Sequence, residues 1–554
     1  MEKRVIVAIV LSILVLVVWQ AVFVKSPQPN PAAQQSLQTQ APVTVPQAKA
    51  VLPAEKPAAD QAASAPGEAA DLAAVQAESE KEIKLDTPLY TAVWSNRGGV
   101  LKSWMLKEHK NEKKEGLELV PLQAAAIGRF PFSIWTEDAS LAEAANSALY
   151  RAQAGSSALA AGERTEIKFE YADGRGLKVE KVFSLTGGRY DLDVSVRAWK
   201  DGREIEPGIV WGPGIGNPSP AEMKQRFSSS TGAAVLSSGK VLRADERKLK
   251  TDQTAFNFAD WAAYEENYFA ALFVLDPGKG AVVFRKEAAE GGPLYFLYVS
   301  RPLKAFIGPK ELDALKDFGH AAKKIINFGF FGSIAEVLLV SIKFIHRYVP
   351  NWGLAIILMT FVIKIIFFPL TLSSTKSMAK MQELQPKIKA LRAKYKKAKQ
   401  DIEQRRQMNE EMMRLYKEHG VNPAGGCLPL LIQLPVFWGV FRMLVVAVEF
   451  RHSPFALWIT DLSVKDPFYV TPILMGATQF IQQKMTPSTA DPAQAKMMLI
   501  MPVVMTVFFM NFQSGLILYW LTTNVLQIAQ QALINRMSAK KKRESDGKRR
   551  KERS

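Results

Sequence analysis

The sequence predicts a multi-pass α-helical membrane protein with six spans and an antiparallel β-sandwich domain inserted outside the membrane. Apolar runs long enough to cross a bilayer, which takes roughly 20 residues, collect at the N-terminus and in the last third of the 554 residues. The stretch between them consists of short alternating runs that are typical of strands. The net charge of +18 is concentrated in two short segments, and this local basicity helps to orient the spans.

The chain begins with Lys3 and Arg4, followed by the apolar run Val5–Val24. Signal peptides have an apolar region of about 7–15 residues and a small-residue cleavage site, whereas this run is longer and offers no convincing site. We therefore expect residues 1–25 to form an uncleaved transmembrane signal anchor with a cytoplasmic N-terminus. Residues 26–83 are rich in Pro, Ala and Gln and predict a flexible linker, because such a composition buries too little apolar surface to fold.

The soluble stretch 84–311 predicts an antiparallel β-sandwich. Runs such as Glu166–Tyr171 and Leu294–Val299 alternate between apolar and polar residues, and turns such as Asp173-Gly174 separate them. Alternation with a period of two and regularly spaced turns are typical of a sheet with one buried face.

Residues 312–349 place apolar side chains at helical spacing opposite lysines and predict an amphipathic helix that lies on the outer membrane face. An alternative is a seventh span over Phe328–Ile345, although this segment carries Glu336 and Lys343. A span at this position would place both basic segments of the chain outside the membrane, which disfavours it.

The last third contains five further candidate spans, which are 352–370, 428–448, 467–483, 497–512 and 515–533. The segment 372–420 between the first two holds 13 Lys/Arg against 6 Asp/Glu, and the tail 536–554 holds 10 against 3. With six spans, both segments are cytoplasmic, as the positive-inside rule requires.

The cytoplasmic segment 372–420 predicts a basic helical hairpin, because Met381, Leu384 and Ile388, and Ile402 after a polar connection, lie at helical spacing among lysines. Its charges fit a solvated helical face and a partner-binding face equally well, and basic runs attract acidic lipid headgroups or nucleic acid. The candidate partner-binding residues of the hairpin and tail are Lys380, Lys387, Lys394, Lys397, Lys540, Lys541, Lys542 and Arg543.

Lys364 lies within the apolar run 353–369 and is the most informative residue of the chain. An ammonium near the bilayer centre costs at least about 2.5–3.5 kcal/mol, so it is expected to face a bundle interior or a hydrated cavity. The alternative is that Lys364 reaches the nearby interface with its flexible stem. Thr360 shares its helix face, and Gln433 and a set of polar residues in the final span, 515–533, are available to line such a cavity or to bond between helices.

Two of the candidate spans, 428–448 and 497–512, offer apolar and flexible surfaces beside these polar residues. Methionine-rich surfaces adapt to varied apolar partners, and contact with lipid explains them equally well. The residues concerned are Leu430, Leu434, Phe437, Met505, Phe508 and Phe509.

The sequence contains no motif of a known catalytic class. It has no Gly-x-Ser-x-Gly elbow, no His-Glu-x-x-His and no phosphate-binding loop, and its five histidines lack the spacing of metal ligands. Its single cysteine, Cys427, excludes an intrachain disulfide. We therefore expect no enzyme, cofactor or metal. An ion-coupled transporter or channel that uses Lys364 remains an alternative, as does an envelope protein that acts through its β-domain.

Several segments resemble the YidC family of membrane protein insertases. The matching segments are Phe368–Thr371, Ser377–Met381, Leu384–Ile388, Asn422–Pro435, Pro454–Ile459, Asp461–Ser463, Asp466–Pro467, Ile473–Gly476, Lys484–Met485 and Ser514–Leu516. The resemblance is dense over 350–535 and implies a five-span insertase core there. It extends to the N-terminal anchor and the outer domain only in layout, which is similar to the long Gram-negative form.

The resemblance implies a multi-pass protein of the bacterial inner membrane, with both termini cytoplasmic and the large domain periplasmic. It implies insertion and folding of nascent membrane proteins, alone or with the Sec translocon, and contacts with lipids and with ribosomal RNA through the hairpin and tail. The implied hydrophilic groove contains Lys364, Thr360, Gln433, Ser514, Asn511 and Trp520. The implied hydrophobic slide consists of the apolar residues of the two flexible spans.

This chain departs from the family pattern at several of these positions. Lys364 stands where many relatives carry arginine, which keeps the charge and loses the planar donor fork. Asn511, Gln513 and Trp520 fall where relatives often have Trp, Pro and Tyr.

Overall fold

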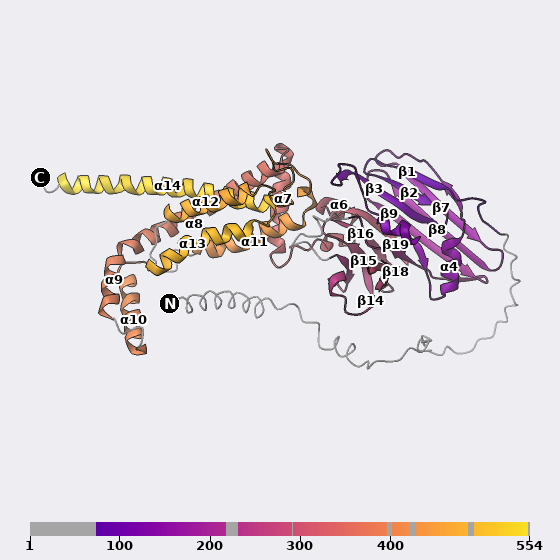
Figure 1. Cartoon of the computed structure of the whole chain (residues 1–554), viewed down its shortest axis with the longest axis horizontal. Helices are drawn as coiled ribbons and strands as arrows, with labels where there is room; N and C mark the ends of the chain where they lie inside the picture. The colour runs from indigo at the N-terminus through magenta and orange to yellow at the C-terminus, as the bar shows by residue number, and fades with distance from the viewer. Residues whose placement is uncertain are drawn as a thin grey trace, which may run out of the picture. The chain divides into compact units, whose positions relative to one another are not determined.

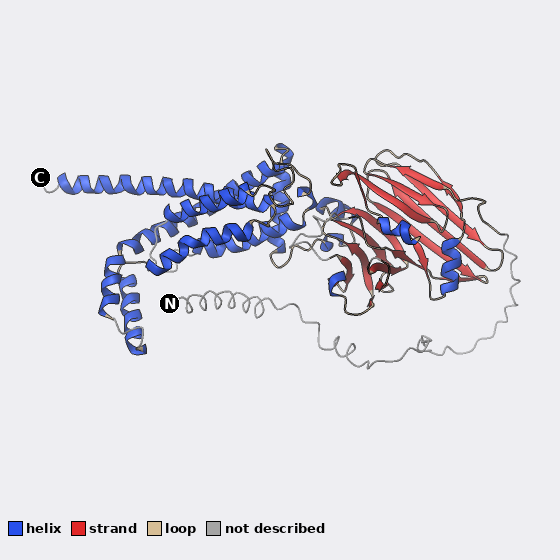
Figure 2. Cartoon of the chain, viewed as in Figure 1, coloured by secondary structure: helices blue, strands red, loops and turns tan. Residues whose placement is uncertain are grey.

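The computed structural model describes residues 74–217, 231–290, 292–395, 401–421, 428–485 and 492–551. The predicted anchor 1–25, most of the predicted linker and Lys397 lie outside these residues, and the side chains of Leu430 and of 540–543 are not described. Within the described chain, strands dominate up to residue 309 and helices follow (Figure 2).

The strands form three antiparallel sheets, which confirms the predicted antiparallel architecture of this part of the chain. The four-stranded sheet has the order β1-β2-β3-β4, and the five-stranded sheet has the order β14-β17-β18-β11-β5. The ten-stranded sheet has the order β13-β12-β15-β16-β19-β9-β8-β7-β6, with β10 paired to β9. The strands are β1 (Glu82–Asp86), β2 (Tyr90–Ser95), β3 (Val100–Lys110), β4 (Gly116–Glu118), β5 (Ser133–Trp135), β6 (Arg151–Ala154), β7 (Arg164–Ala172), β8 (Leu177–Thr186), β9 (Asp191–Lys200), β10 (Arg203–Ile205), β11 (Gly208–Trp211), β12 (Gly232–Ser237), β13 (Lys240–Asp245), β14 (Gln253–Asn257), β15 (Ala259–Glu265), β16 (Phe269–Leu275), β17 (Ala281–Glu287), β18 (Leu294–Ser300) and β19 (Pro302–Pro309).

Aromatic side chains join the sheets into a β-domain with a common core. The residues of β8 alternate between buried and half-buried positions along the whole strand, as expected for a sheet with one face against the core. Trp94 of β2 lies 4.2 Å from Phe183 of β8, and Tyr264 of β15 lies 5.7 Å from Phe284 of β17, measured between ring centroids. The ten-stranded sheet therefore packs against both smaller sheets.

The β-domain begins earlier than the predicted linker boundary at residue 83. Val75 donates its backbone N–H to the carbonyl of Ala172 at 2.9 Å, and Glu80 forms a 2.9 Å ion pair with Arg97. Residues 74–83 therefore belong to the folded domain. The composition of residues 74–83 did not predict that they fold, because backbone pairing and surface ion pairs do not require apolar side chains.

The helices of the described chain are α3 (Leu122–Ile127), α4 (Ala139–Ser147), α6 (Leu312–Phe318), α7 (Gly332–Tyr348), α8 (Trp352–Glu383), α9 (Gln385–Lys394), α10 (Ile402–Glu418), α11 (Leu428–Val446), α12 (Val470–Met485), α13 (Pro492–Phe509) and α14 (Ser514–Lys551). The 3₁₀ turns are η1 (Glu246–Lys248), η2 (Ala322–Ile325) and η4 (Val448–Phe450). Figure 1 labels most of these helices and the larger strands.

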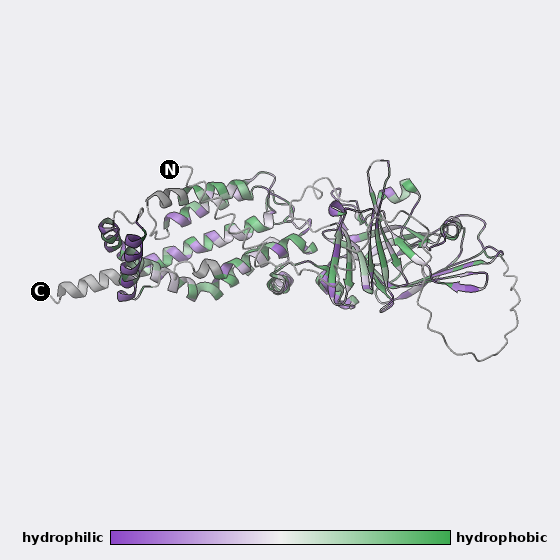
Figure 3. Ribbon diagram, turned by 90° about the horizontal axis from the view of Figure 1, so that it is seen from below, coloured by the Kyte–Doolittle hydropathy of each residue, from purple (hydrophilic) through white to green (hydrophobic). Residues whose placement is uncertain are grey.

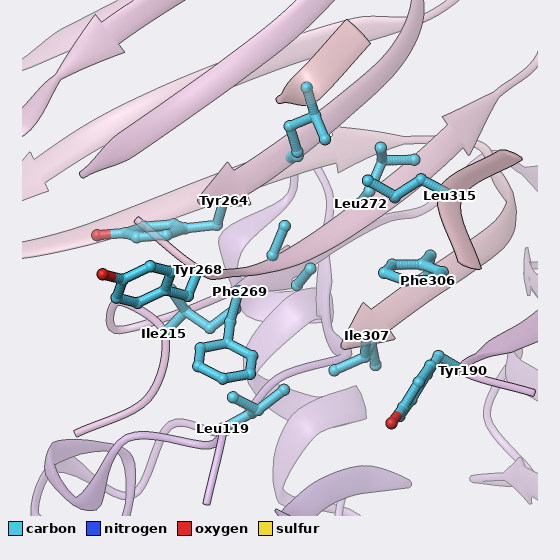
Figure 4. Close-up of a cluster of buried hydrophobic side chains, with 14 of the residues drawn as sticks. Leu119, Tyr190, Ile215, Tyr264, Tyr268, Phe269, Leu272, Phe306, Ile307 and Leu315 are labelled. Atoms are coloured by element: carbon cyan, nitrogen blue, oxygen red, sulfur yellow. The ribbon is translucent and has the colours of Figure 1, made fainter. Parts of the chain in front are cut away.

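The prediction of one amphipathic helix over 312–349 is wrong in its continuity. The segment folds as α6, η2 and α7, and the first break falls at Gly319, whose φ of +80° ends α6. The apolar face of α6 lies in the β-domain core, where Phe318 approaches Phe306 at 5.5 Å between ring centroids. Figure 4 shows Leu315 of α6 beside Phe306 and Leu272. Helical periodicity located the apolar face but did not distinguish a protein core from a lipid surface.

The five predicted spans of the last third fall on α8, α11, α12, α13 and α14. By length and hydropathy, α8 is the one described helix that could cross a membrane, and Ile432–Val446 and Met498–Phe509 are shorter apolar helices. The helix α8 continues through Pro369 to Glu383, so Lys364 lies within the helix and far from both of its ends. The count of six spans remains a prediction.

Glycines allow two helix pairs to approach closely. A Cβ added at Gly476 of α12 would lie 1.9 Å from Oγ1 of Thr506 on α13. A Cβ added at Gly439 of α11 would lie 2.8 Å from the side chain of Ile334 on α7. Small residues at helix crossings are typical of membrane bundles, in which packing and not the hydrophobic effect drives association.

Within the predicted helical hairpin 372–420, residues 372–383 continue α8, and α9 and α10 form the pair of helices. Leu384, Ile388 and Val421 are buried together with Met381, and Leu415 packs against this small core. Figure 3 shows this hairpin in hydrophilic colours next to the more apolar long helices.

Candidate functional site

Lys364 reaches across from α8 to α14. Its Nζ donates a hydrogen bond to Oε1 of Gln527 at 2.9 Å, and both residues are half-buried. The sequence places no Asp or Glu in α8 before Glu383, in α11, α12 or α13, or in α14 before Glu544. The helices around Lys364 therefore provide an amide acceptor and no carboxylate.

Thr360 lies one turn before Lys364 on the same helix, as the sequence predicts. It is buried, and its Oγ1 donates to the carbonyl of Ile356 at 2.6 Å. A hydroxyl that bonds to its own helix in this way satisfies itself and tends to bend the helix. The described contacts of Thr360 therefore concern α8 itself.

The polar stripe of α14 faces α12 as well as α8. Nδ2 of Asn524 donates to the carbonyl of Met475 at 3.1 Å. Oε1 of Gln479 and Nε2 of Gln530 are buried and have no hydrogen-bond partner among the described residues.

Ser514 and Asn511 lie away from this pair. The hydroxyl and the backbone N–H of Ser514 both donate to the carbonyl of Val464, at 2.8 and 2.7 Å, and they fix the start of α14. Because a helix rises 1.5 Å per residue, Ser514 lies about 20 Å along α14 from Gln527. Asn511 precedes the helix and is exposed. The structure therefore does not bring these two predicted groove residues to Lys364.

Trp520 lies between the polar stripe and an aromatic cluster. Its ring centroid is 5.0 Å from that of Phe437 on α11 and 4.8 Å from that of Phe509 on α13. Phe509 is only 4% exposed, so it supports the cluster from within, whereas Phe508 is 53% exposed and Leu434 is 43% exposed. Gln433 and Met505 are half-buried. Of the predicted slide, Phe508 and Leu434 thus present apolar surface outward.

An ion-pair cluster connects α7 with its surroundings. Nζ of Lys343 lies 2.7 Å from Asp313, 2.9 Å from Glu311 and 3.2 Å from Glu449. Burial alone would lower the pKa of Lys343, but the three carboxylates raise it above its ordinary value. These contacts fix α7 to α6 and to the segment after α11. They also provide the charge of Lys343 with partners, which the alternative of a seventh span over Phe328–Ile345 did not.

Some charges of the basic hairpin are engaged within the hairpin. Lys394 forms a 2.7 Å ion pair with Glu411, and Nζ of Lys387 lies 2.8 Å from Nε2 of His419. Lys380 is exposed. Among the described residues, no group of His, Cys, Asp and Glu is arranged to hold a metal ion.

Sequence reasoning singled out Gln527 only as one of several polar residues of the last span, and it did not predict the contact with Lys364. The two positions are 163 residues apart in the chain, so periodicity within either helix carries no signal for the contact. The absence of Asp and Glu from α8 before Glu383 and from α14 before Glu544 was the available hint that Lys364 bonds to an amide.

Comparisons with known proteins agree with this layout. The family model of the 60Kd inner membrane protein matches residues 344–542, and that of the YidC periplasmic domain matches residues 82–340. The membrane protein insertase YidC of Geobacter metallireducens is 37% identical over 97% of this chain and 99% of its own length. That of Syntrophus aciditrophicus is 37% identical over 97% and 100%. A solved structure of an active YidC insertase with its first transmembrane domain resolved is 20% identical, with a TM-score of 0.37 over 83% of this chain and 94% of that one.

Proposed function

The chain belongs to the YidC family of membrane protein insertases, and from this premise we propose that it inserts nascent inner-membrane proteins and helps them to fold. It works alone or together with the Sec translocon and performs no chemical step. Transfer of apolar surface into lipid and the membrane potential supply the energy.

The observation that carries the proposal is the position of Lys364 in a part of α8 and beside a part of α14 that contain no Asp or Glu. Its ammonium bonds to a neutral amide at 2.9 Å, and among the described residues no ion pair of Lys364 is found. A cation at membrane depth attracts a hydrophilic and acidic segment of a substrate and lowers the cost of moving that segment partway across.

The apolar helix of the substrate leaves along the surfaces that hold Leu434 and Phe508. Both side chains are among the exposed apolar residues of α11 and α13, and apolar burial in lipid drives release. The neighbouring helix α7 exposes an apolar stripe on one face while its opposite face is buried, which supports a position at the outer membrane surface. The stripe consists of Val337, Val340, Phe344 and Tyr348.

The cytoplasmic hairpin and tail receive the substrate. Lys380, Lys387, Lys394 and the basic tail contact ribosomal RNA or the nascent chain through long-range attraction. In this proposal the signal anchor and five further spans place both termini in the cytoplasm and the β-domain in the periplasm.

Site-specific photo-crosslinking tests this function. A photoreactive residue replaces Phe508 or Phe437 in the full chain, and stalled ribosomes then display a short single-span protein. We expect crosslinks to the substrate at both positions only when the nascent chain is present. Matched controls are Val337 on the apolar stripe of α7 and Leu122 on α3, which are 64% and 73% exposed and lie off the proposed path. Silence at Phe508 and Phe437, with a probe that remains reactive toward lipid, would contradict the proposal.

A further inference from the structure

The bond between Lys364 and Gln527 pairs a cation inside an apolar helix with an acceptor that carries no charge. An ammonium has three donors, and a glutamine side chain offers one carbonyl oxygen. Gln527 therefore orients Nζ toward α14 through one 2.9 Å hydrogen bond. A carboxylate at the same place would form a salt bridge and remove the positive charge from reach of any other partner.

The carboxylates of α8 and α14 lie too far from Lys364 to neutralise its ammonium. The first acidic residue of α14 is Glu544, 17 positions beyond Gln527 and therefore about 25 Å along the helix. The acidic residue of α8, Glu383, lies 19 positions beyond Lys364, about 28 Å away. At these distances neither carboxylate can form an ion pair with Lys364.

The position of Gln527 on its helix also connects two parts of the site. Trp520 precedes it by seven residues and so lies on the same face of α14 two turns away. Trp520 packs on Phe437 and Phe509, beside the apolar surfaces of α11 and α13. The amide of Gln527, which fixes the cation of Lys364, therefore lies on the same face of α14 as Trp520. It is about 10 Å along the helix from the aromatic cluster.

We propose that Gln527 is a positioning residue that makes the site selective for substrate segments carrying a carboxylate, because its amide fixes the ammonium of Lys364 and leaves the charge free for the substrate. The inference rests on the proposed function, which already names an acidic segment, and adds to it the residue that holds the ammonium of Lys364 in place. The acidic segment binds at Lys364, and the apolar segment that follows it lies along the aromatic cluster.

The test compares two substrates in liposomes that contain the full chain and have no membrane potential. Both are the same single-span protein, with three Asp or three Asn in the short translocated segment. We expect wild type to insert the Asp form better than the Asn form. We expect Q527E to lower insertion of the Asp form about tenfold, which corresponds to about 1.4 kcal/mol, and to change insertion of the Asn form by less than about twofold. A purely structural role of Gln527 would reduce both substrates alike.

The matched control is Q483E on α12. Gln483 is also half-buried, and its Nε2 donates to the carbonyl of Met498 at 2.7 Å, so the same substitution removes a hydrogen bond without touching Lys364. We expect it to leave the ratio of Asp to Asn insertion at the wild-type value.

A second variant decides the matter if Q527E does not accumulate. The exchange K364Q/Q527K moves the ammonium to α14 and the amide to α8, and we expect it to retain the preference for the Asp form. Loss of that preference in a folded exchange variant, or an unchanged ratio in Q527E, would overturn the inference while leaving insertion itself established. If wild type inserts neither substrate above empty liposomes, both without a membrane potential and with one imposed, the proposed function fails and the inference fails with it.

Discussion

The β-domain and the helical region each bury a lysine that lacks a carboxylate, and they treat it in opposite ways. Lys181 of β8 is 0% exposed, and its Nζ donates to the carbonyls of Gly98, Phe132 and Gly99 at 2.6, 2.8 and 3.3 Å. Lys364 is half-buried, and one hydrogen bond, to Gln527, is recorded for its Nζ.

In the proposed function, this difference separates a lysine that stabilises the fold from a lysine that attracts the substrate. Three backbone carbonyls accept all three protons of the Lys181 ammonium and join β8 to the loops around Gly98 and Phe132. Nothing is left for an external partner. Among the described residues, Lys364 has one acceptor, and the proposed function assigns its remaining donors to water or to a substrate. Burial of a charge alone therefore does not identify a site, and the count of satisfied donors is the more informative quantity.

The largest expected effect concerns Lys181, whose three protons are all bonded within the β-domain. We expect K181A to lower the free energy of unfolding of the β-domain by about 3–5 kcal/mol, because it leaves a cavity and three carbonyls without their donor. Hydrogen exchange of β-domain amides in the full chain measures this loss. The control is K178A on the same strand, where Nζ of Lys178 lies 4.9 Å from the ring of Trp199 and about 0.5–1 kcal/mol is expected. Equal losses in both variants would contradict a structural role specific to Lys181.

Overpacking of the helical region is expected to have a smaller effect. We expect G476L to destabilise the pairing of α12 and α13 by about 1–3 kcal/mol, because any Cβ at this position meets Thr506. Thermal unfolding of the full chain in detergent measures the change. The neighbouring substitution A477L adds a larger side chain at an exposed position and is expected to be nearly neutral. A neutral G476L would mean that α12 and α13 separate readily.

The burial of Lys181 also predicts that the stability of the β-domain depends on pH. Burial lowers the pKa of Lys181 to about 7, from an ordinary value of 10.5. Between these values the unfolded chain binds more protons than the folded one, so the free energy of unfolding rises with pH, by up to about 1.4 kcal/mol per pH unit. Below pH 7 both states are protonated and this contribution is constant. Hydrogen exchange of wild type and K181M across this range measures the slope, and an equally steep slope in K181M would assign it to other groups.

The smallest effect is expected at the exposed lysines of the hairpin. We expect K394A to leave the stability of the full chain nearly unchanged, because an exposed ion pair such as that with Glu411 contributes little. Denaturant unfolding of the full chain checks this. In contrast, charge reversal at Lys380, Lys387 and Lys394 together is expected to weaken ribosome binding at low salt. A large stability loss in K394A would show that the pair contributes to the hairpin core.

Sequence reasoning predicted those features that depend on local patterns. Alternation with a period of two located the strands, because each strand buries one face. Helical spacing identified Met381, Leu384 and Ile388 as the core of the hairpin. The same logic failed at Ile402, which is 82% exposed at the start of α10, because a periodic position is buried only if a neighbouring element covers it.

Features that depend on contacts between distant segments could not be predicted in this way. The partners of Lys181 are 82 and 83 residues away for Gly99 and Gly98, and 49 away for Phe132. They are backbone atoms, which every residue possesses. In the same way, Phe508 and Phe509 are adjacent in sequence, yet one is half exposed and the other is enclosed beside Trp520. Their different roles follow from how α13 is oriented against α14.

The most direct test of the proposed role of Lys364 reverses its charge. Insertion of substrates with a short Asp-containing or Lys-containing translocated segment is measured for wild type and K364E, in liposomes without a membrane potential. If Lys364 attracts the substrate, wild type favours the Asp form and K364E favours the Lys form, with the ratio of the two yields inverted. If K364E retains the wild-type preference for the Asp form, the charge at Lys364 does not select the substrate and the central claim is contradicted.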